Sequence, residues 1–549
     1  MDMPKPARGI VVFGGGTATN SLVDVFERLR ESRNCALQYV IPISDNGGSS
    51  SELIRVFGGP GIGDVRSRLV RLIPPSETDA ERAFLKSLFN YRLASDPFAA
   101  RSEWLGIVEG RHELWADISS EKRELIRSIF NHANMEIVKR ARPSSVFNFT
   151  KASIGNLFLT GARLFTGSLE SAIYLLSTIC AIPSTVAVLP AINSSFTHHI
   201  SAGLEDGTQI TGQNAISHPS APTSLPDTGD TAAMIAETLS PSTLAPITST
   251  STPSTTPTPT PITTTVTATS TDITASLQPP GRPESVQEDP QSVLRETEAH
   301  DRIEDATLPG SLPSLRKQYI TFSKAPSSAH ELPARISRIW YINPYGHEIY
   351  PLANPKVLSS ITHSSAVIYS IGSLYTSLVP GLILRGVGHA ISSSAARRKI
   401  LILNATLDRE TGPSAHALTA TDFVRAVATA CEGRSRGRLP AAHHAEHARA
   451  LGTGAGAEER KPPSEGGVGA SDDDDVVRKY VTHLVYLEGE GVPKVDRAEL
   501  AALGVDCVRV YGRRVDGMLR YDEAGLEGAL EAIVGKAEMA RSRRNTSGQ

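Results

Sequence analysis

The chain has 549 residues, of which 40% are hydrophobic and 21% charged, so it is long enough to bury a sizeable core. Its formal net charge of −3 gives no general attraction to nucleic acid or to an anionic membrane surface, and we expect neither as a partner. No apolar run is long enough to predict a membrane span. The four scattered cysteines form no CxxC pair or zinc spacing, and no signal peptide is recognisable. These features predict a cytoplasmic protein.

The first predicted strand covers residues 9–13 (GIVVF) and runs directly into the glycine-rich loop of residues 14–17. Loops of this kind lie at the carboxyl edge of an open parallel sheet, where phosphorylated ligands bind. Glycine lets backbone N–H groups approach a phosphate closely, and a helix N-terminus adds partial positive charge. A tight turn without ligand is the alternative. An NAD-binding oxidoreductase is a weaker interpretation, because Thr19 stands where the third fingerprint glycine belongs.

A second strand, predicted over residues 37–44, ends in the segment DNGGSS at residues 45–50. Asp45 at a strand end has ordinary interpretations as a helix cap or as part of an Asn-Gly turn. Two glycines and three serines follow closely, however, and these are rich in backbone and hydroxyl donors. One carboxylate beside such donors suits a Mg²⁺ ion that bridges phosphates, so Asp45 is the candidate metal ligand.

A third glycine-rich loop, at residues 58–63, leads into a predicted helix over residues 64–72. Asp64 and Arg66 open this helix. Arg66 is suited to a bidentate contact with a phosphate, and the alternative is an ion pair with Asp64 or another neighbour. Residues 81–140 follow as a helical excursion rich in Leu, Phe, Arg and Glu.

Small polar residues also stand at later junctions, where further strands end or helices begin. Asn156 opens a helical pattern over residues 153–177, and Asn193 follows the strand of residues 185–189. Taken singly, each is a turn or lies beside a helix cap. Together they predict a ligand cleft along one sheet edge, which also receives Gly372 and Ser373 after the strand of residues 366–370.

Two segments of low complexity interrupt the chain. Residues 219–330 are rich in Ser, Thr and Pro, and residues 433–475 are rich in Ala, Gly, Arg and acidic residues. Neither can bury enough surface to offset its conformational entropy, so both are predicted to be disordered insertions. The other parts alternate strands and helices. They include a helix with Phe26 and Leu29 on one face, an ordered segment that resumes near residue 337 (SRIWYI), and a helix over residues 374–391. This alternation predicts one α/β domain with a doubly wound, mostly parallel Rossmann-like sheet and helices on both faces. These parts are residues 1–218, 331–432 and 476–540.

In this order, the motifs resemble those of the 2-phospho-L-lactate transferase (CofD) family and of the related bacterial gluconeogenesis factors. The resemblance covers the predicted ordered segments from residue 9 to about residue 533, and DNGGSS and GSLYTS look closer to the gluconeogenesis-factor branch. The matching motifs are GGGT at 14–17, SDNGGSS at 44–50, GDVR at 63–66, SIGNLFL at 153–159, VLPA at 188–191, LEDGTQITGQ at 204–213, GSLYTSLVP at 372–380 and KILILN at 399–404.

The resemblance implies a cleft for a nucleotide diphosphate. One branch implies a Mg²⁺-dependent transferase, in which a phospholactyl group moves from a guanosine-diphosphate-linked donor to a deazaflavin precursor. The other implies a non-catalytic regulator of carbon metabolism that binds a nucleotide sugar. Both remain open, as does assembly into a homo-oligomer.

Individual residues also take their expected roles from the resemblance. Asp45 matches the position expected to hold Mg²⁺ and is the candidate catalytic residue. Asn46 replaces the second acidic residue usual there, so a single carboxylate is expected at the metal, and Asn193 stands where relatives usually have Asp. The expected ligand contacts are Gly15, Gly16, Thr17, Asn46, Gly47, Gly48, Ser49, Asp64, Arg66, Asn156, Asn193, Gly372 and Ser373.

Overall fold

The computed structural model describes residues 7–74, 80–141, 146–218, 331–343, 345–412, 416–433, 476–515 and 517–546. All of them belong to one compact unit, formed by Met1–Leu225 together with Leu308–Gln549. The predictions of disorder concern segments 219–330 and 433–475, which lie outside the described residues except for Gly433.

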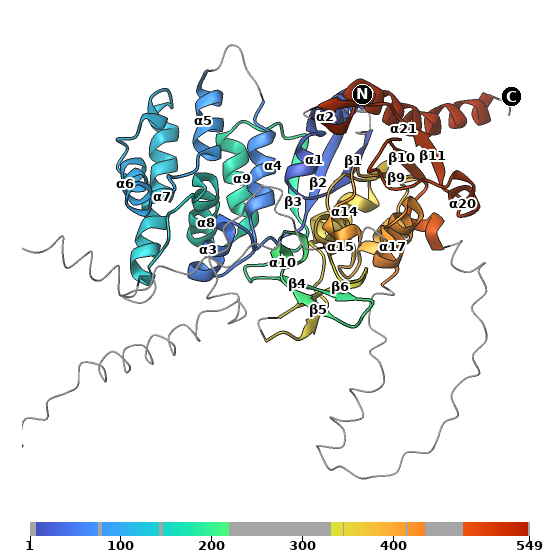
Figure 1. Cartoon of the computed structure of the whole chain (residues 1–549). Helices are drawn as coiled ribbons and strands as arrows, with labels where there is room; N and C mark the ends of the chain where they lie inside the picture. The colour runs from blue at the N-terminus through green and yellow to red at the C-terminus, as the bar shows by residue number, and fades with distance from the viewer. Residues whose placement is uncertain are drawn as a thin grey trace, which may run out of the picture. The chain divides into compact units, whose positions relative to one another are not determined.

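A seven-stranded parallel sheet forms the centre of the fold, in the order β11-β10-β9-β8-β1-β2-β3 (Figure 1). The chain moves outward from β1 through β2 to β3, then returns beside β1 and continues in the other direction. This confirms the predicted doubly wound, Rossmann-like arrangement. The strands are β1 (Ala7–Phe13), β2 (Cys35–Ile41), β3 (Val186–Pro190), β8 (Ala366–Tyr369), β9 (Arg398–Ile402), β10 (His483–Tyr486) and β11 (Asp506–Arg509).

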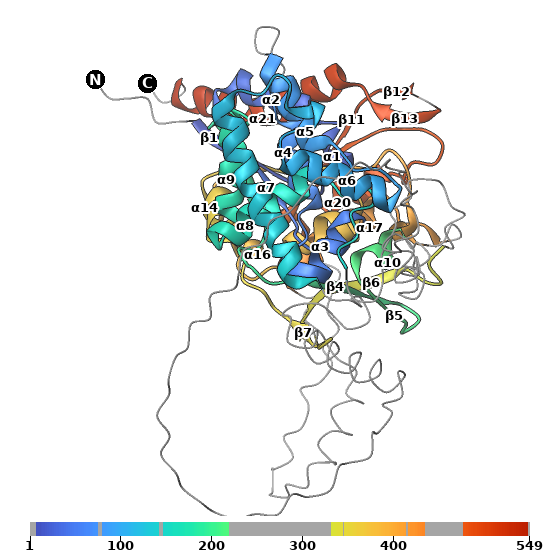
Figure 2. The ribbon, with the colours of Figure 1, turned by 90° about the vertical axis from the view of Figure 1, so that its left-hand side faces the viewer.

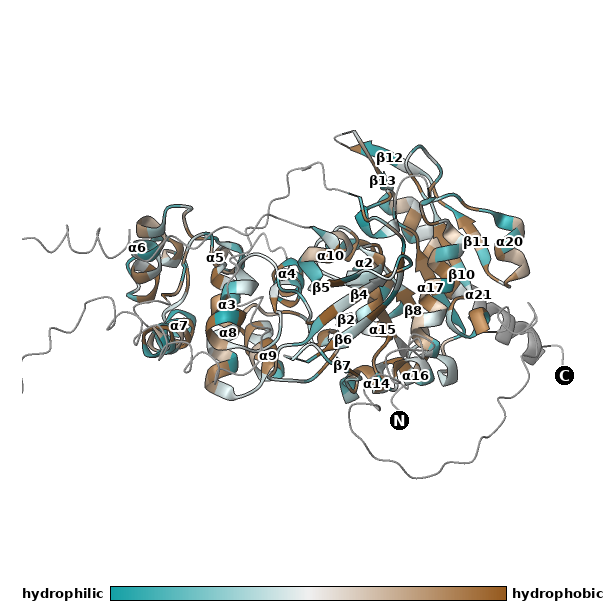
Figure 3. Ribbon diagram, turned by 60° about the horizontal axis from the view of Figure 1, so that its bottom comes forward, coloured by the Kyte–Doolittle hydropathy of each residue, from teal (hydrophilic) through white to brown (hydrophobic). Residues whose placement is uncertain are grey.

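The central strands are apolar on both faces because helices cover the sheet from both sides. Side chains from Ile10 to Phe13 in β1 and from Ala366 to Tyr369 in β8 are at most 1% exposed. Figure 3 shows the same pattern as brown strands beside helices that are brown on one side and teal on the other.

Helix α2 (Val23–Arg33) follows β1 and packs against β2 and α21 (Glu523–Thr546). Its Phe26 and Leu29 are fully buried, as their helical spacing predicted. The connections from β3 back to β8 and onward to β9 and β10 run in the opposite direction along the sheet. Because such crossovers are right-handed, their helices lie on the face opposite α2. These helices are α14 (Pro355–Thr362), α15 (Val379–Leu382), α16 (Val387–Ser393) and α17 (Ala420–Glu432).

The predicted helical excursion is a helical layer that packs beside the β3 edge of the sheet and faces the viewer in Figure 2. Its core contains Trp104 and Phe130, whose rings meet edge to face with centroids 5.5 Å apart. No helix in the described part of the chain is long and apolar enough to span a membrane. The excursion itself comprises α5 (Ala80–Asn90), α6 (Pro97–Val108), η1 (Glu113–Trp115) and α7 (Ser120–Arg140). The other helices of this half of the chain are α1 (Thr17–Asn20), α3 (Ser49–Phe57), α4 (Gly63–Arg71), α8 (Ile154–Thr166) and α9 (Leu169–Ile179).

A separate four-stranded antiparallel sheet, in the order β5-β4-β6-β7, was not predicted. Strand β6 was expected to continue the alternating β/α pattern, but it pairs with β4 across the segment 219–330. This pairing holds the two flanks of that segment together. The strands are β4 (His199–Leu204), β5 (Gln209–Thr211), β6 (Ile336–Ile342) and β7 (Glu348–Ile349), and helix α10 (Gln213–Ser217) follows β5.

The single helix expected over residues 374–391 is divided. A π-helical turn η2 (Leu374–Leu378) leads into α15, and Gly386 then precedes α16 with a φ of +95°. That left-handed conformation interrupts a helix and is readily adopted by glycine. The helical pattern was therefore recognised, but its interruption at Gly386 was not. The remaining elements are η3 (Arg409–Thr411), α20 (Arg497–Ala502) and the hairpin of β12 (Gly512–Val515) and β13 (Met518–Tyr521).

Candidate functional site

A cavity of about 820 Å³ opens beyond the carboxyl ends of β1 and β8. The strand order reverses between these two neighbouring strands, and doubly wound sheets bind ligands at such a point. All but two of the predicted site residues line the cavity. Those that do are Gly15, Gly16, Thr17, Asp45, Gly47, Gly48, Ser49, Asp64, Arg66, Asn156, Gly372 and Ser373.

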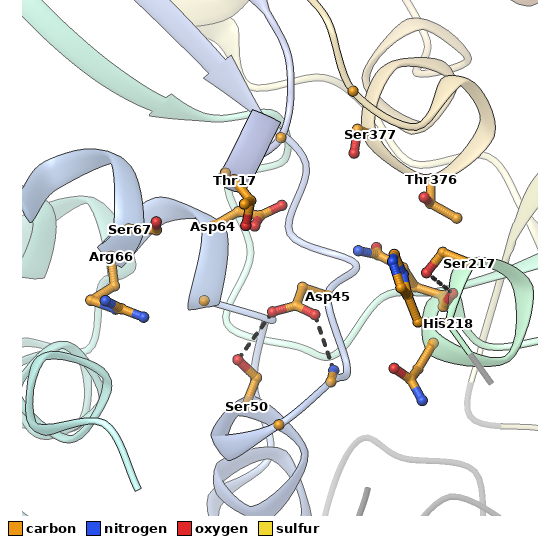
Figure 4. A pocket seen from close by; sticks show the side chains of 18 of the residues that line it. Thr17, Asp45, Ser50, Asp64, Arg66, Ser67, Ser217, His218, Thr376 and Ser377 are labelled. Atoms are coloured by element: carbon orange, nitrogen blue, oxygen red, sulfur yellow. Dashed lines mark hydrogen bonds between the residues drawn. The ribbon is translucent and has the colours of Figure 1, made fainter. Parts of the chain in front are cut away.

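Asp45 lies just after β2 and points into the cavity (Figure 4). Its Oδ1 accepts a hydrogen bond from the backbone N–H of Gly47 at 3.0 Å, and its Oδ2 accepts one from the Ser50 hydroxyl at 3.2 Å. These bonds orient the carboxylate and stabilise its charged form. Burial outweighs them and raises the pKa of Asp45.

Asp64 is a second carboxylate in the same cavity, which corrects the expectation of a single one (Figure 4). It lies in the first turn of α4 and accepts a hydrogen bond from the backbone N–H of Gly16. Burial, followed by repulsion from Asp45, raises the pKa of Asp64 to about 7. The acidic partner of Asp45 is therefore supplied by the third glycine-rich loop and not by its own neighbour in sequence.

Glycines allow the surrounding loops to approach these two carboxylates. A Cβ added to Gly63 would overlap the carboxylate of Asp45, and one added to Gly61 would overlap the Asp45 backbone. A Cβ on Gly16 would likewise overlap the Asp64 carboxylate. Close approach therefore explains the glycines at these positions, and both Gly16 and Gly63 also stand at the start of a helix.

Arg66 brings a positive charge into the same cavity as Asp45 and Asp64. It is 7% exposed and donates to the amide oxygens of Asn156 and Asn90, at 3.3 and 3.2 Å. The alternative ion pair between Arg66 and Asp64 is not formed in the described structure. Burial, followed by repulsion from Arg92, lowers the pKa of Arg66 to about 10, which leaves the guanidinium charged near neutral pH.

The loop after β8 forms the wall of the cavity opposite Asp45. We define this β8 wall as Gly372, Ser373, Thr376 and Ser377, all of which line the cavity. Gly372 has a φ of +146° and is held from behind by Asn404. The Gly372 N–H donates to Oδ1 of Asn404 at 3.0 Å, and Nδ2 of Asn404 donates to the Gly372 carbonyl at 2.8 Å.

Two predicted residues, Asn46 and Asn193, do not line the cavity. Asn46 is buried and turned away, because its Oδ1 accepts a hydrogen bond from the backbone N–H of Asn214 at 3.0 Å. It therefore supports the start of α10 and only indirectly the cavity. Asn193 is exposed beyond β3, since the carboxyl end of this edge strand lies away from the switch point.

Several lining residues were missed in the sequence. Arg92 and Lys151 share one rim of the cavity, where the Arg92 Nη1 donates to the Lys151 carbonyl at 3.4 Å. Lys151 has a φ of +53°, an uncommon conformation for a non-glycine residue, and no sequence pattern predicted this conformation. The other missed polar residues include Asn90 from the α5 end and the α10 group of Gln213, Asn214, Ser217 and His218.

No group of three or more His, Cys, Asp or Glu side chains suited to holding a metal ion occurs among the residues that the structure describes. The pair Asp45 and Asp64 is therefore the acidic feature of the cavity from which any metal proposal must start.

The chain matches a known protein family over most of its length. The model of the family described as 2-phospho-L-lactate transferase CofD matches residues 10–455. The chain belongs to the CofD family. The match covers most of the chain and confirms the resemblance inferred from the motifs.

The chain is also similar to individual proteins. The uncharacterized protein YNL011C of Saccharomyces cerevisiae is 39% identical over 402 residues, which cover 73% of this chain and 79% of the relative. The gluconeogenesis factor of Halalkalibacterium halodurans is 25% identical over 209 residues, 38% of this chain and 45% of that protein. The crystal structure of protein BH3568 from Bacillus halodurans aligns with a TM-score of 0.49 and 17% identity, covering 96% of this chain and 99% of that one.

Proposed function

We propose that this CofD-family protein binds a nucleotide-diphosphate-linked ligand, together with Mg²⁺, in the cavity between the ends of β1 and β8. The observation that carries the proposal is the pair of carboxylates, Asp45 and Asp64, that line one cavity among glycine-rich loops. Backbone N–H groups near a helix N-terminus and the buried Arg66 would contact the diphosphate. The cavity volume is in the range of small-molecule sites.

The residues present fit Mg²⁺. Burial raises the pKa of both carboxylates, and repulsion from Asp45 adds to the rise for Asp64, so a cation would stabilise their charged forms. Mg²⁺ commonly uses one or two carboxylates and completes its coordination with waters and substrate phosphates. Asp45 and Asp64 would hold the ion, which when bound would supply neutralisation of the diphosphate charge.

Transfer chemistry of the 2-phospho-L-lactate transferase type is our proposal for the reaction. The protein would act mainly by positioning, since the glycine-rich loops and Ser373 would fix the diphosphate at the switch point. Arg66, held by Asn156 and Asn90, would stabilise negative charge that develops on the departing phosphate.

A non-catalytic nucleotide-sugar-binding regulator is the second candidate. It is motivated by the bacterial relative named gluconeogenesis factor, which matches part of this chain. Both candidates require the same cavity and differ only in whether a product forms.

Thermal unfolding of the full chain tests binding. GDP, UDP-glucose and NAD are each added with and without MgCl₂, and a ligand at 100 times its Kd would stabilise the protein by about 2.7 kcal/mol. We expect GDP or UDP-glucose to raise the Tm in a Mg²⁺-dependent manner. The absence of a shift with either nucleotide would overturn the proposal, and a shift with NAD alone would favour the dinucleotide alternative.

Mass spectrometry of the nucleotide that binds separates the two candidates. The nucleotide-linked donor is incubated with the protein, Mg²⁺ and the deazaflavin precursor as acceptor, and the mixture is then searched for the transferred group on the acceptor and for the released nucleotide. A product that disappears in Asp45→Asn supports the transferase. Saturable binding without any product supports the regulator.

A further inference from the structure

A second acidic pair, Asp408 and Glu410, lies behind the β8 wall and does not line the cavity. It belongs to the segment that follows β9, which we define as the clamp segment, residues 404–411. Glu410 is 1% exposed, so its carboxylate is available only to protein groups.

Glu410 holds the first turn of η2. It accepts hydrogen bonds from the backbone N–H groups of Tyr375 and Thr376, at 2.8 and 3.0 Å, and a third from the Thr376 hydroxyl. These N–H groups would otherwise be open at the start of a helical turn. Because Thr376 lines the cavity, Glu410 fixes a residue of the β8 wall from behind.

Other members of the clamp segment hold the same wall. Asn404 makes two hydrogen bonds to the backbone of Gly372, and Asp408 accepts one from the Ser373 hydroxyl. Arg409 reaches the opposite wall, where its Nε donates to the Ile216 carbonyl in α10 at 3.1 Å. One short segment therefore connects the β8 wall to α10 without entering the cavity itself.

We propose that Glu410 is a positioning residue for the ligand cavity, which sets the conformation of the β8 wall without touching the ligand. This inference rests on the proposed function for its effect on affinity, but not for its effect on the wall. Glu410 acts through Thr376, while Asn404 and Asp408 secure the preceding residues. A wall released from Glu410 would lose the preorganisation that ligand binding requires.

Glutamine is a close substitute at this position. Its Oε1 can accept the two backbone N–H bonds, and its Nε2 can donate to the Thr376 hydroxyl. Burial, followed by repulsion from Asp408, raises the pKa of Glu410 to about 8, so a neutral side chain is compatible with the site near neutral pH. Glu410→Gln should therefore preserve the wall, whereas Glu410→Ala removes every acceptor.

A matched control is available in Glu170 of α9. This carboxylate is 8% exposed and accepts hydrogen bonds from Asn354 and Lys356 at 2.7 and 2.6 Å, but it does not line or border the cavity wall. Glu170→Ala therefore reproduces the loss of a buried carboxylate without releasing the wall.

The first test is hydrogen exchange at the amides of Tyr375 and Thr376 in the full chain, without ligand. We expect slow exchange in the wild type, in Glu410→Gln and in Glu170→Ala, and fast exchange in Glu410→Ala. Protection that persists in folded Glu410→Ala would overturn the proposal, whether or not any nucleotide binds.

The second test is calorimetric titration of GDP and of UDP-glucose in the presence of MgCl₂, with the Tm of each variant measured in parallel. Because ligand binding must then order the released wall, we expect Glu410→Ala to weaken binding by at least about tenfold. Glu410→Gln should restore affinity to within about threefold. If Glu410→Ala and Glu170→Ala lose Tm equally and both keep the affinity of the wild type, the role of Glu410 is purely structural.

The two proposals fail in different ways. If neither nucleotide binds the wild type, the proposed function fails, and the exchange experiment alone decides whether Glu410 holds the wall. If the wild type binds but Glu410→Ala binds equally well, the proposed function stands and the positioning role is wrong.

Discussion

The same edge of the sheet carries two acidic pairs whose surroundings differ. Asp45 and Asp64 line the cavity, while Asp408 and Glu410 lie behind its wall. Burial and mutual repulsion raise carboxyl pKa values in both pairs. The difference is in access to the cavity. Glu410 receives three hydrogen bonds from η2 and does not line the cavity, whereas Asp45 and Asp64 receive two and one and still line it.

The two pairs show how an acidic pair with a structural role differs from one that is suited to a ligand. A buried carboxylate that is satisfied by backbone N–H groups acts as part of the structure. A pair that keeps accessible oxygens and repels itself gains from a cation. Raised pKa values alone do not distinguish these cases, since both pairs show them.

The largest expected effect comes from Asp45→Asn and from Asp64→Asn. Loss of one of two carboxylates should weaken Mg²⁺-dependent nucleotide binding on the order of a hundredfold, because each contributes charge and a ligand oxygen. Calorimetric titration of GDP and UDP-glucose, with and without MgCl₂, measures the loss. The exposed Asp117→Asn is the control and should bind as the wild type does. If both cavity variants kept their Mg²⁺ dependence, the metal assignment would be wrong.

Much of the fold and of the site was predictable from local patterns. The apolar runs of β1 and β8 and the helical spacing of Phe26 and Leu29 are properties of neighbouring residues, so the sequence displayed them directly. The strand-end position of Asp45 and the loop of Gly15 and Gly16 followed from the same rule. Their place in the cavity agrees with the prediction, while their contact with ligand stays a prediction.

The features that were missed depend on contacts between distant parts of the chain. The pairing of β4 with β6 crosses a long segment, and Asp64 becomes the partner of Asp45 only because Gly61 and Gly63 permit close packing. Nothing in local spacing reveals such contacts. The clamp segment illustrates the same limit, since its role depends on packing behind β8.

An intermediate effect is expected from Gly16→Ala. The new Cβ would overlap the Asp64 carboxylate, and overpacking of this kind costs about 1–3 kcal/mol. Gly106→Ala in α6 is a matched control, because a Cβ there meets no atom within 4 Å and alanine favours a helix by about 1 kcal/mol. Chemical denaturation should show destabilisation in the first variant and stabilisation in the second. Equal stability of Gly16→Ala and wild type would show that the first loop can retreat from Asp64.

The smallest expected effect is the pH dependence of the pair in the cavity. The folded pKa of Asp64 is raised to about 7, so the folded protein without metal keeps a proton that the unfolded chain has already lost above its ordinary carboxyl pKa. The contribution of this group to stability therefore falls as the pH rises from about 4 toward 7 and is then constant. Asp64→Asn should remove this contribution and raise the Tm of the metal-free protein at pH 8 relative to the wild type.

Mg²⁺ should bind more tightly as the pH rises, because it competes with the proton on Asp64. With a pKa of about 7, the apparent Mg²⁺ affinity should be about tenfold lower at pH 6 than at pH 8, and binding at pH 6 should release close to one proton. Titration of the wild type with MgCl₂ at both pH values, in two buffers of different ionisation enthalpy, measures both quantities. Glu410→Gln serves as the control, since the satisfied pair behind the β8 wall should leave this pH dependence unchanged. A pH-independent affinity would place the metal away from Asp64 and remove the contrast between the two acidic pairs.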